Sequence, residues 1–449
     1  MYDFSPSSAR RRSPVSSHVV WPPPRSPSPS RTAPRPRWSR SSRTLKSALR
    51  VRPLWLVTVI ALAAVIVIFG LTVYQPYIEI QFHSREWIRQ HITPELSKGA
   101  PPKCFTSGLS PSYNITEGLY GKRRWEVQSG TGMQLGRDCY EFAGTLGKGG
   151  LGLGPTDTYT EVTERKVYHT YWRTDLTPFG DRQAHMLRSF FATQPRSASK
   201  LILWSNGDLL PNPILSNFLS RYPESFELRV VNIPDLAKGT PLEGTDYVSG
   251  SGVNDKKAWV DGDLIRLLVV WNDGGIWVDM DMLLTRSLDP LWEHEFVIQW
   301  DCYDKPLQPF NGALLSFHKH SPYLCLMFEI MKISPAPTPA STDWGSLLYL
   351  KAYRTLLHLS IPPFRILPWC FIDGASCRLD NRLPDPFIPD IPSSRRSGDL
   401  DRVLGMVFGV HLHNRWEKQF PKDGWVDRLV LRKYDRVLGR RGEDDIEES

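Results

Sequence analysis

A single apolar segment divides this chain into two unequal parts. Residues 54–74, LWLVTVIALAAVIVIFGLTVY, are 21 consecutive residues without a charge. A helix of this length spans about 30 Å, which is the thickness of the hydrocarbon core of a bilayer. A secretory signal peptide has a shorter apolar core and does not normally begin about fifty residues into a chain. The segment therefore predicts one transmembrane helix.

The sequence before this segment is basic and rich in Ser, Pro and Arg. Residues 1–52 contain twelve Lys or Arg and one acidic residue, so the rest of this chain of net charge +8 is slightly acidic. Such a composition buries too little apolar surface to become ordered, which predicts a disordered tail. Because basic residues crowd only the amino-terminal side of the apolar segment, we expect a cytosolic tail and a type II protein with its bulk across a secretory membrane. A basic patch confined to the tail also argues against nucleic-acid binding.

The cysteines support an oxidising compartment. All six follow the apolar segment, at Cys104, Cys139, Cys302, Cys325, Cys370 and Cys377. Six cysteines allow fifteen connectivities, and the sequence does not choose among them. Short spacing suggests a local pair between Cys370 and Cys377, and Cys104 with Cys139 is a second candidate pair. The glycosylation sequon at Asn114 lies on the same side of the apolar segment.

The remaining chain predicts a stem or accessory region, a large α/β domain and a short acidic tail, at residues 75–160, 161–435 and 436–449. Segments typical of strands alternate with segments typical of helices, in the order 166–172, 181–194, 200–206, 212–223 and 226–233. This alternation predicts a mostly parallel sheet with helical crossovers. Such sheets bind ligands beyond the carboxyl ends of their strands.

The stretch NDGGIWVDMDMLLT, residues 272–285, carries the strongest chemical pattern. Before it, we expect a helix that is capped by Asn254 or Asp255 and ends at a double glycine, Gly274 and Gly275. The apolar face of that helix is formed by Leu264, Leu267, Leu268 and Trp271. The sequence IWVDMDMLL then predicts a strand that ends beside a ligand.

Two aspartates in this predicted strand, Asp279 and Asp281, are two residues apart and therefore project to the same side. Their charges repel unless a cation lies between them and a ligand. Carboxylate oxygens suit Mn2+ or Mg2+, and these ions complete their coordination with phosphates and water. The pair therefore predicts a clamp for a metal and a diphosphate. The alternative is a solvated acidic turn, which the apolar setting and the preceding helix disfavour. That helix carries Asp263 and Arg266 on one face, where they pair with each other or contact a ligand.

The stretch GDLIRLLVVWNDGGIWVDMDMLL resembles glycosyltransferases with a DXD sugar-binding motif. That family includes the yeast initiating α-1,6-mannosyltransferase, the inositolphosphoceramide mannosyltransferases, and the α-1,4-galactosyl- and α-1,4-N-acetylglucosaminyltransferases. The resemblance covers about residues 163–430 and is most specific at 261–284, where Trp277 replaces the usual Tyr. It implies a GT-A-like fold and a nucleotide-sugar donor.

By this resemblance, Asp263 and Arg266 touch hydroxyls of the donor sugar. Asp279 contacts ribose and the metal, and Asp281 contacts the metal and the diphosphate. Further matches in VYHTYW, PFNGALL and GVHLHNRW give the additional candidates His169, Trp172, Asn311, Gly312 and His411. The resemblance leaves open whether His411 binds metal or is structural, and whether Trp172 stacks on the nucleotide base or packs in the core.

The resemblance implies a metal-dependent, retaining hexosyltransferase that makes an α-linkage, and with the apolar segment it predicts a location in a Golgi or ER membrane. The donors left open are GDP-mannose, UDP-galactose and UDP-GlcNAc, and the acceptor is a glycan or glycolipid. One alternative is a non-catalytic membrane-anchored binding protein on the same fold. A phosphohydrolase with a DxD nucleophile is a further alternative, although such enzymes usually carry Thr or Val four residues after the first Asp, where this chain has Leu283.

Overall fold

The computed structural model describes residues 53–74, 80, 82–91, 103–106, 112–129, 137–147, 164–249, 255–300, 308–374, 383–389 and 397–439. The predicted basic tail, part of the predicted stem, Cys302, Cys377 and most of the acidic tail lie outside these residues. The chain divides into two compact units, Met1–Gln81 and Phe82–Ser449.

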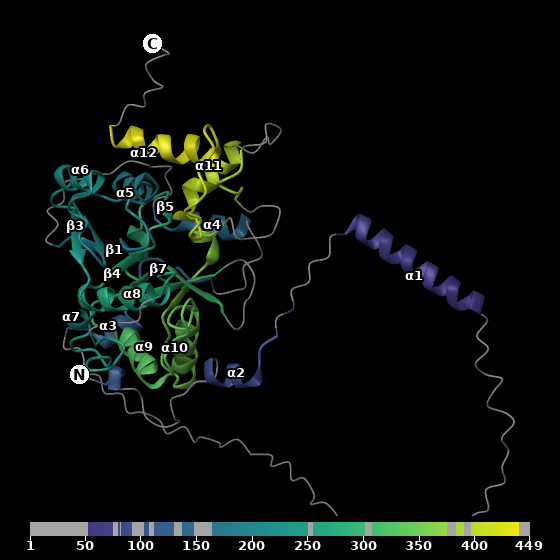
Figure 1. Cartoon of the computed structure of the whole chain (residues 1–449), viewed down its shortest axis with the longest axis horizontal. Helices are drawn as coiled ribbons and strands as arrows, with labels where there is room; N and C mark the ends of the chain where they lie inside the picture. The colour runs from purple at the N-terminus through teal and green to yellow at the C-terminus, as the bar shows by residue number, and fades with distance from the viewer. Residues whose placement is uncertain are drawn as a thin grey trace, which may run out of the picture. The chain divides into compact units, whose positions relative to one another are not determined.

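The first unit contributes one described helix, α1 (Pro53–Val73). Within it, Trp55–Val73 is long and apolar enough to cross a membrane (Figure 1). These bounds agree with the span of 54–74 expected from the sequence.

The second unit is built from strands and helices in alternation. Its strands are β1 Lys166–Trp172, β2 Ser199–Ser205, β3 Phe226–Val230, β4 Gly275–Val278, β5 Met282–Leu284, β6 Phe296–Gln299, β7 Phe310–Phe317, β8 Arg365–Leu367 and β9 Gly409–His411. Its α-helices are α2 Arg85–His91, α3 Ile115–Tyr120, α4 Arg137–Thr145, α5 Asp181–Thr193, α6 Pro213–Arg221, α7 Ile233–Leu236, α8 Val260–Asp273, α9 Pro322–Ile333, α10 Ser346–His358, α11 Ser397–Met406 and α12 Arg432–Val437. Shorter helical turns are η1 Lys103–Phe105, η2 Asp289–Leu291, η3 Trp369–Phe371 and η4 Asp427–Leu431.

Seven strands form one mixed sheet in the order β3-β2-β1-β4-β7-β6-β8, and β5 pairs with β9 separately. Strands β3, β2, β1 and β4 pair in parallel, whereas β7 is antiparallel to both β4 and β6, and β6 is parallel to β8. Of the seven strands, β7 alone runs against the others. Its amino end therefore lies at the edge where the other six strands end. The structure confirms the α/β class with a mostly parallel sheet.

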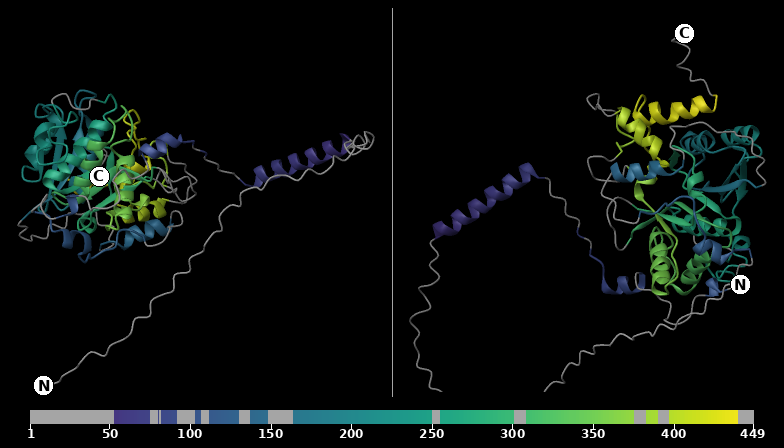
Figure 2. Two further views of the ribbon diagram at one scale, coloured as in Figure 1. Left: turned by 90° about the horizontal axis from the view of Figure 1, so that it is seen from below. Right: turned by 180° about the vertical axis from the view of Figure 1, so that it is seen from behind.

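The sheet is buried on both faces by helices. Along β2, Leu201 and Leu203 pack into one hydrophobic cluster, whereas Ile202 and Trp204 pack into the other, as strand alternation requires. Helix α5 contributes to the first cluster, while α8, α9 and α10 contribute to the second. Figures 1 and 2 show these helices in layers on either side of the strands.

The local segments predicted from 166 to 233 are confirmed within one to three residues, but α8 begins later than expected. The residue directly before the helix is Trp259, but Asp255 caps the helix from further back in the chain. Its carboxylate accepts hydrogen bonds from the backbone N–H groups of Trp259 and Val260 at 3.1 and 3.2 Å. The acidic side chain thus satisfies helix N–H groups across a short turn, and α8 starts at Val260. Asn254 lies outside the described residues.

The double glycine after α8 is required by both conformation and space. Gly274 and Gly275 have φ angles of +70° and +107°, a region that glycine adopts at low cost. A Cβ atom on Gly274 would lie 2.6 Å from the backbone nitrogen of Lys319, and one on Gly275 would lie 2.1 Å from the carbonyl oxygen of Val167. The two glycines let the chain turn from α8 into β4 against these neighbours.

The disulfide pairs suggested by short spacing are wrong. The structure joins Cys104 to Cys325 and Cys139 to Cys370, across 221 and 231 residues of sequence. The cysteines are paired by tertiary packing, because η1 lies against α9, and α4 lies against η3. These bonds tie residues from the predicted stem into the second compact unit, which begins at Phe82.

Candidate active site

The segment IWVDMDMLL is not one continuous strand, as the sequence suggested. β4 ends at Val278 and β5 begins at Met282, with a turn between them in which the Met282 N–H donates to the Asp279 carbonyl at 3.1 Å. The chain turns because β5 leaves the main sheet to pair with β9. Asp279 and Asp281 lie within this turn, at the carboxyl end of β4. Their carboxylates nevertheless lie close together, each offering an oxygen within 4.8 Å of the other and of a His411 nitrogen.

Asp279 is held by side chains from α8 and β4. Arg266 donates from Nη2 to Asp279 Oδ1 at 3.0 Å, and Trp277 donates from Nε1 to the same oxygen at 2.6 Å. Arg266 also donates from Nη1 to Asp263 Oδ1 at 2.7 Å and to the Tyr349 hydroxyl at 3.3 Å. Asp263 and Arg266 therefore pair with each other, and the pair reaches the first aspartate of the motif. The sequence did not single out Tyr349.

Two glycines make room for this ion pair. A Cβ atom on Gly312, in β7, would lie 1.7 Å from Arg266 Nη1, and one on Gly345, before α10, would lie 2.6 Å from Asp263 Oδ2. Burial raises the pKa of Asp263 to about 7, although the Arg266 charge opposes this shift. Arg266 and Asp263 thus lie in a dry, close-packed setting where their geometry is fixed.

Asp281 is held by the carboxyl-terminal part of the chain. The β5–β9 ladder places His411 opposite Met282, and His411 Nε2 lies 3.5 Å from Asp281 Oδ2. The backbone N–H of Asn414 donates to the same oxygen at 2.5 Å. Asn414 and the preceding His413 both have positive φ angles, +55° and +53°, which turns this N–H toward the carboxylate. Burial acts to raise the pKa of Asp281, but the His411 charge and this hydrogen bond outweigh it and lower the pKa to about 2.

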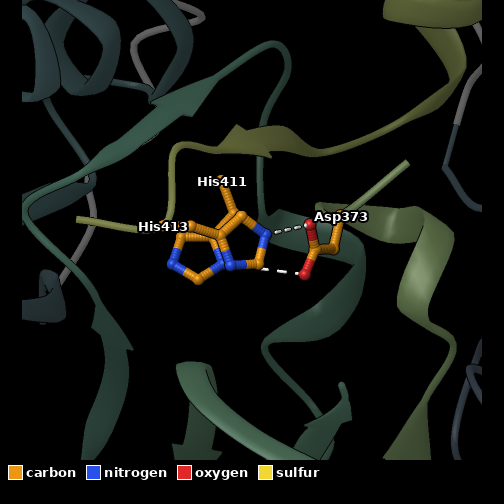
Figure 3. A group of neighbouring side chains, drawn as sticks. All are labelled: Asp373, His411 and His413. Atoms are coloured by element: carbon orange, nitrogen blue, oxygen red, sulfur yellow. Dashed lines mark hydrogen bonds and ion pairs between the residues drawn. The ribbon is translucent and has the colours of Figure 1, made fainter. Parts of the chain in front are cut away.

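Another carboxylate, that of Asp373, lies beside His411 (Figure 3). Asp373 Oδ2 is 3.7 Å from His411 Nδ1, and Asp373 Oδ1 is 2.7 Å from His413 Nε2. Asp373 follows β8 and η3, where the Cys139–Cys370 disulfide anchors the chain. No local pattern in the sequence marks Asp373, because its position depends on pairings between distant segments.

The side chains around His411 fit a divalent cation. Asp279, Asp281 and His411 offer two carboxylate oxygens and one imidazole nitrogen within 4.8 Å of one another. His411 is 5 % exposed, and its Nε2 and Nδ1 atoms lie 3.5 and 3.7 Å from the carboxylates of Asp281 and Asp373, without a hydrogen bond to either. A buried polar nitrogen without a hydrogen bond is costly unless a ligand completes it. Oxygen donors with one imidazole suit Mn2+ or Mg2+.

The other candidate residues fall into two groups. Asn311 and Gly312 lie at the start of β7, next to Ala313, whose carbonyl accepts the Asp279 N–H at 2.9 Å. His169 and Trp172 lie in β1 and use their ring nitrogens within the protein. His169 is fully buried, with Nε2 2.9 Å from the Gly274 carbonyl and Nδ1 3.1 Å from Trp204 Nε1.

Trp172 is 9 % exposed and donates from Nε1 to the Thr177 carbonyl at 2.9 Å. These contacts use the ring nitrogens of both β1 residues within the protein, and stacking of the Trp172 ring on a nucleotide base stays a prediction.

One protein-family model matches the part of the chain that contains the candidate site. A family model described as "Glycosyltransferase sugar-binding region containing DXD motif" matches residues 180–297, which include α8, the double glycine and both aspartates. No curated protein matches the chain.

Two solved structures that match the chain are described as glycosyltransferases, and both have low sequence identity to it. "PaToxG Glycosyltransferase" is 14% identical with a TM-score of 0.29, over 44% of this chain and 75% of that one. "WbbM bifunctional glycosytransferase apo structure" is 9% identical with a TM-score of 0.37, over 63% of this chain and 52% of that one.

Proposed function

We propose that this chain, whose residues 180–297 match the glycosyltransferase sugar-binding region containing a DXD motif, transfers a hexose from a nucleotide-sugar donor to a glycan or glycolipid acceptor. The proposed donors are GDP-mannose, UDP-galactose and UDP-GlcNAc. One observation carries the proposal. The motif aspartates, Asp279 and Asp281, meet the buried His411 in a donor set for Mn2+ or Mg2+.

In the proposed mechanism, Asp279, Asp281 and His411 would hold the metal. A bound metal would supply positive charge to the diphosphate as the bond to the anomeric carbon breaks. Asp279 keeps one oxygen on Arg266 and Trp277, which orients its other oxygen. The Asn414 N–H fixes Asp281 in the same way.

Asp263 and Arg266 are proposed to position the donor sugar through its hydroxyl groups. Their pairing with each other and with Asp279 ties the sugar position to the metal position, which supports orientation of the anomeric carbon for attack. Asn311 and Gly312 are proposed donor neighbours from the facing end of β7. We further propose that the anomeric configuration is retained, giving an α-linkage.

The proposed location is a Golgi or ER membrane, with α1 as a single-pass anchor and the second unit in the lumen. The apolar helix, the two disulfides and the exposed Asn114 sequon support this orientation. Sealed microsomes provide the test. Protease added outside should remove only the basic tail, and digestion of the second unit would contradict the orientation.

A phosphohydrolase in which Asp279 is the nucleophile is disfavoured by the same contacts. One oxygen of Asp279 accepts hydrogen bonds from both Arg266 and Trp277, which lowers its nucleophilicity. A binding protein without catalysis remains the alternative, because a fold does not guarantee an activity.

The deciding experiment is a panel of nucleotide sugars incubated with the full-length protein and Mn2+, scored for nucleotide release. We expect release from one donor class only, and loss of release after chelation of the metal. Absence of release from every donor, with and without glycan and glycolipid acceptors, would favour the binding protein.

A further inference from the structure

Arg182, in the first turn of α5, lies among aromatic rings and forms no ion pair with an acidic side chain in the part of the chain that the structure describes. Its guanidinium carbon is 4.3 Å from the Phe420 ring centroid, 5.6 Å from that of Trp416 and 5.7 Å from that of Phe387. Its Nε and Nη2 atoms are buried without a hydrogen-bond partner, and the described residues give it no ion pair. The side chain as a whole keeps part of its surface exposed. Buried guanidinium N–H groups without acceptors are costly in free energy, which suggests that a bound anion accepts their hydrogen bonds.

Arg182 lies near the half of the candidate metal site that the carboxyl-terminal segment, from His411 onward, provides. Its charge interacts with that of Asp281. Trp416 and Phe420 follow His411 in the chain, and the Trp416 ring packs at 4.9 Å against Trp172, at the carboxyl end of β1. Arg182 therefore faces the same edge of the sheet as the motif aspartates.

The other buried arginines near this edge are already neutralised. Arg266 is paired with Asp263 and Asp279, and Arg173 is paired with Asp261 at 3.1 Å. Burial lowers the pKa of Arg182 to about 10, partly offset by Asp281, so the side chain stays charged at neutral pH. The aromatic rings hold a planar cation whose N–H edges match the geometry of phosphate oxygens.

We infer that Arg182 binds the diphosphate of the nucleotide-sugar donor, as a contact independent of the metal. This inference rests on the proposed function and deepens it. A divalent ion held by Asp281 would bring the diphosphate beside this carboxylate, and among the described residues Arg182 is a partly buried cation there without an ion pair. A guanidinium in this position adds positive charge to the leaving diphosphate as the bond to the sugar breaks.

The test compares two affinities in the full-length protein in detergent, by titration calorimetry. Mn2+ is titrated first without nucleotide, and UDP, GDP, UMP, GMP and inorganic pyrophosphate are titrated next with Mn2+ present. The variants are Arg182→Gln, which removes the charge, and Arg182→Lys, which keeps the charge but loses the fork. Arg165→Gln is the matched control, because Arg165 precedes β1 at the opposite end of that strand and bonds to Glu224.

We expect Arg182→Gln to weaken binding of the preferred nucleoside diphosphate and of pyrophosphate by roughly 10-fold to 100-fold. The affinity for nucleoside monophosphates should fall by a smaller factor. Mn2+ should bind the nucleotide-free variant equally well or more tightly, because removal of Arg182 removes a charge that repels the metal. The diphosphate affinity of Arg182→Lys should lie between those of wild type and Arg182→Gln. The affinity of Arg165→Gln should match that of wild type.

Two outcomes would overturn the inference. One is an unchanged diphosphate affinity in a folded Arg182→Gln or Arg182→Lys protein. The other is an equal loss of Mn2+ and diphosphate affinity, which would give Arg182 a structural role in packing the aromatic rings. Failure of wild type to bind Mn2+ would instead contradict the proposed function, so the two failures are distinguishable.

Discussion

The two aspartates of the motif are held by parts of the chain that lie at very different distances from them in the sequence. Asp279 is held by Arg266 and Trp277, which lie within 13 residues of it. Asp281 is held by His411 and Asn414, at least 130 residues further along the chain. The first half of the site is therefore assembled by one helix, one turn and one strand. The second half exists only after β5 has paired with β9.

This difference predicts which structural changes should affect the Asp279 half of the site and which should affect the Asp281 half. Damage to the α8–β4 turn should displace Asp279 together with the sheet, because β4 lies in its centre. Damage around η3 and β9 should instead loosen His411 while the main sheet stays intact.

The largest expected effect is on the first half, through Gly275→Ala. A Cβ atom there would lie 2.1 Å from the Val167 carbonyl oxygen, at a φ of +107°. Overpacking and backbone strain together should lower the free energy of unfolding by about 3–5 kcal/mol. Chemical denaturation measures this loss. Gly239→Ala is the matched control, because Gly239 has a φ of +73° with nothing within 4 Å, and it should lose only about 1–2 kcal/mol. Equal losses in the two variants would show that the contact with Val167 is unimportant.

The two disulfides provide the next comparison. Replacing either cysteine pair by serines should cost about 2–5 kcal/mol of stability. Only loss of Cys139–Cys370 should also weaken Mn2+ binding, because that bond anchors η3 just before Asp373. The Cys104–Cys325 bond joins η1 to α9 and serves as the control. Similar Mn2+ affinities in both folded double-serine variants would contradict the separation of the two halves.

The smallest predicted effect concerns Asp373, which lies 3.7 Å from His411 Nδ1. Carboxylates that orient a metal-binding histidine typically contribute about 10-fold to 100-fold in metal affinity. We expect Asp373→Asn to weaken Mn2+ binding by about 10-fold, with no further loss in a His411→Gln background. A full additional loss in that background would mean that Asp373 acts independently of His411.

The sequence predicted the first half of the site much better than the second. Helix α8, the double glycine and the Asp263–Arg266 pair follow from local periodicity and turn chemistry. The same local reasoning extended β4 through Asp281, because nothing in IWVDMDMLL signals that β5 leaves the sheet to join β9. The disulfide partners, Asp373 and Asn414 depend on contacts between distant segments, which no spacing in the chain encodes.

Resemblance to a family filled part of this gap. It pointed to His411, which lies next to Asp281. It also pointed to His169 and Trp172, whose ring nitrogens bond within the protein. A shared position in a motif does not distinguish packing from ligand contact.

The central claim is that Asp279, Asp281 and His411 hold one divalent cation from both halves of the site. Calorimetric titration of Mn2+ into the full-length protein tests it most directly. We predict one Mn2+ per chain in wild type and at least about 100-fold weaker binding in Asp279→Asn and in Asp281→Asn. The double variant should be little worse than either single variant, because each one already disables the same clamp. A folded Asp279→Asn/Asp281→Asn protein that binds Mn2+ as tightly as wild type would contradict the account.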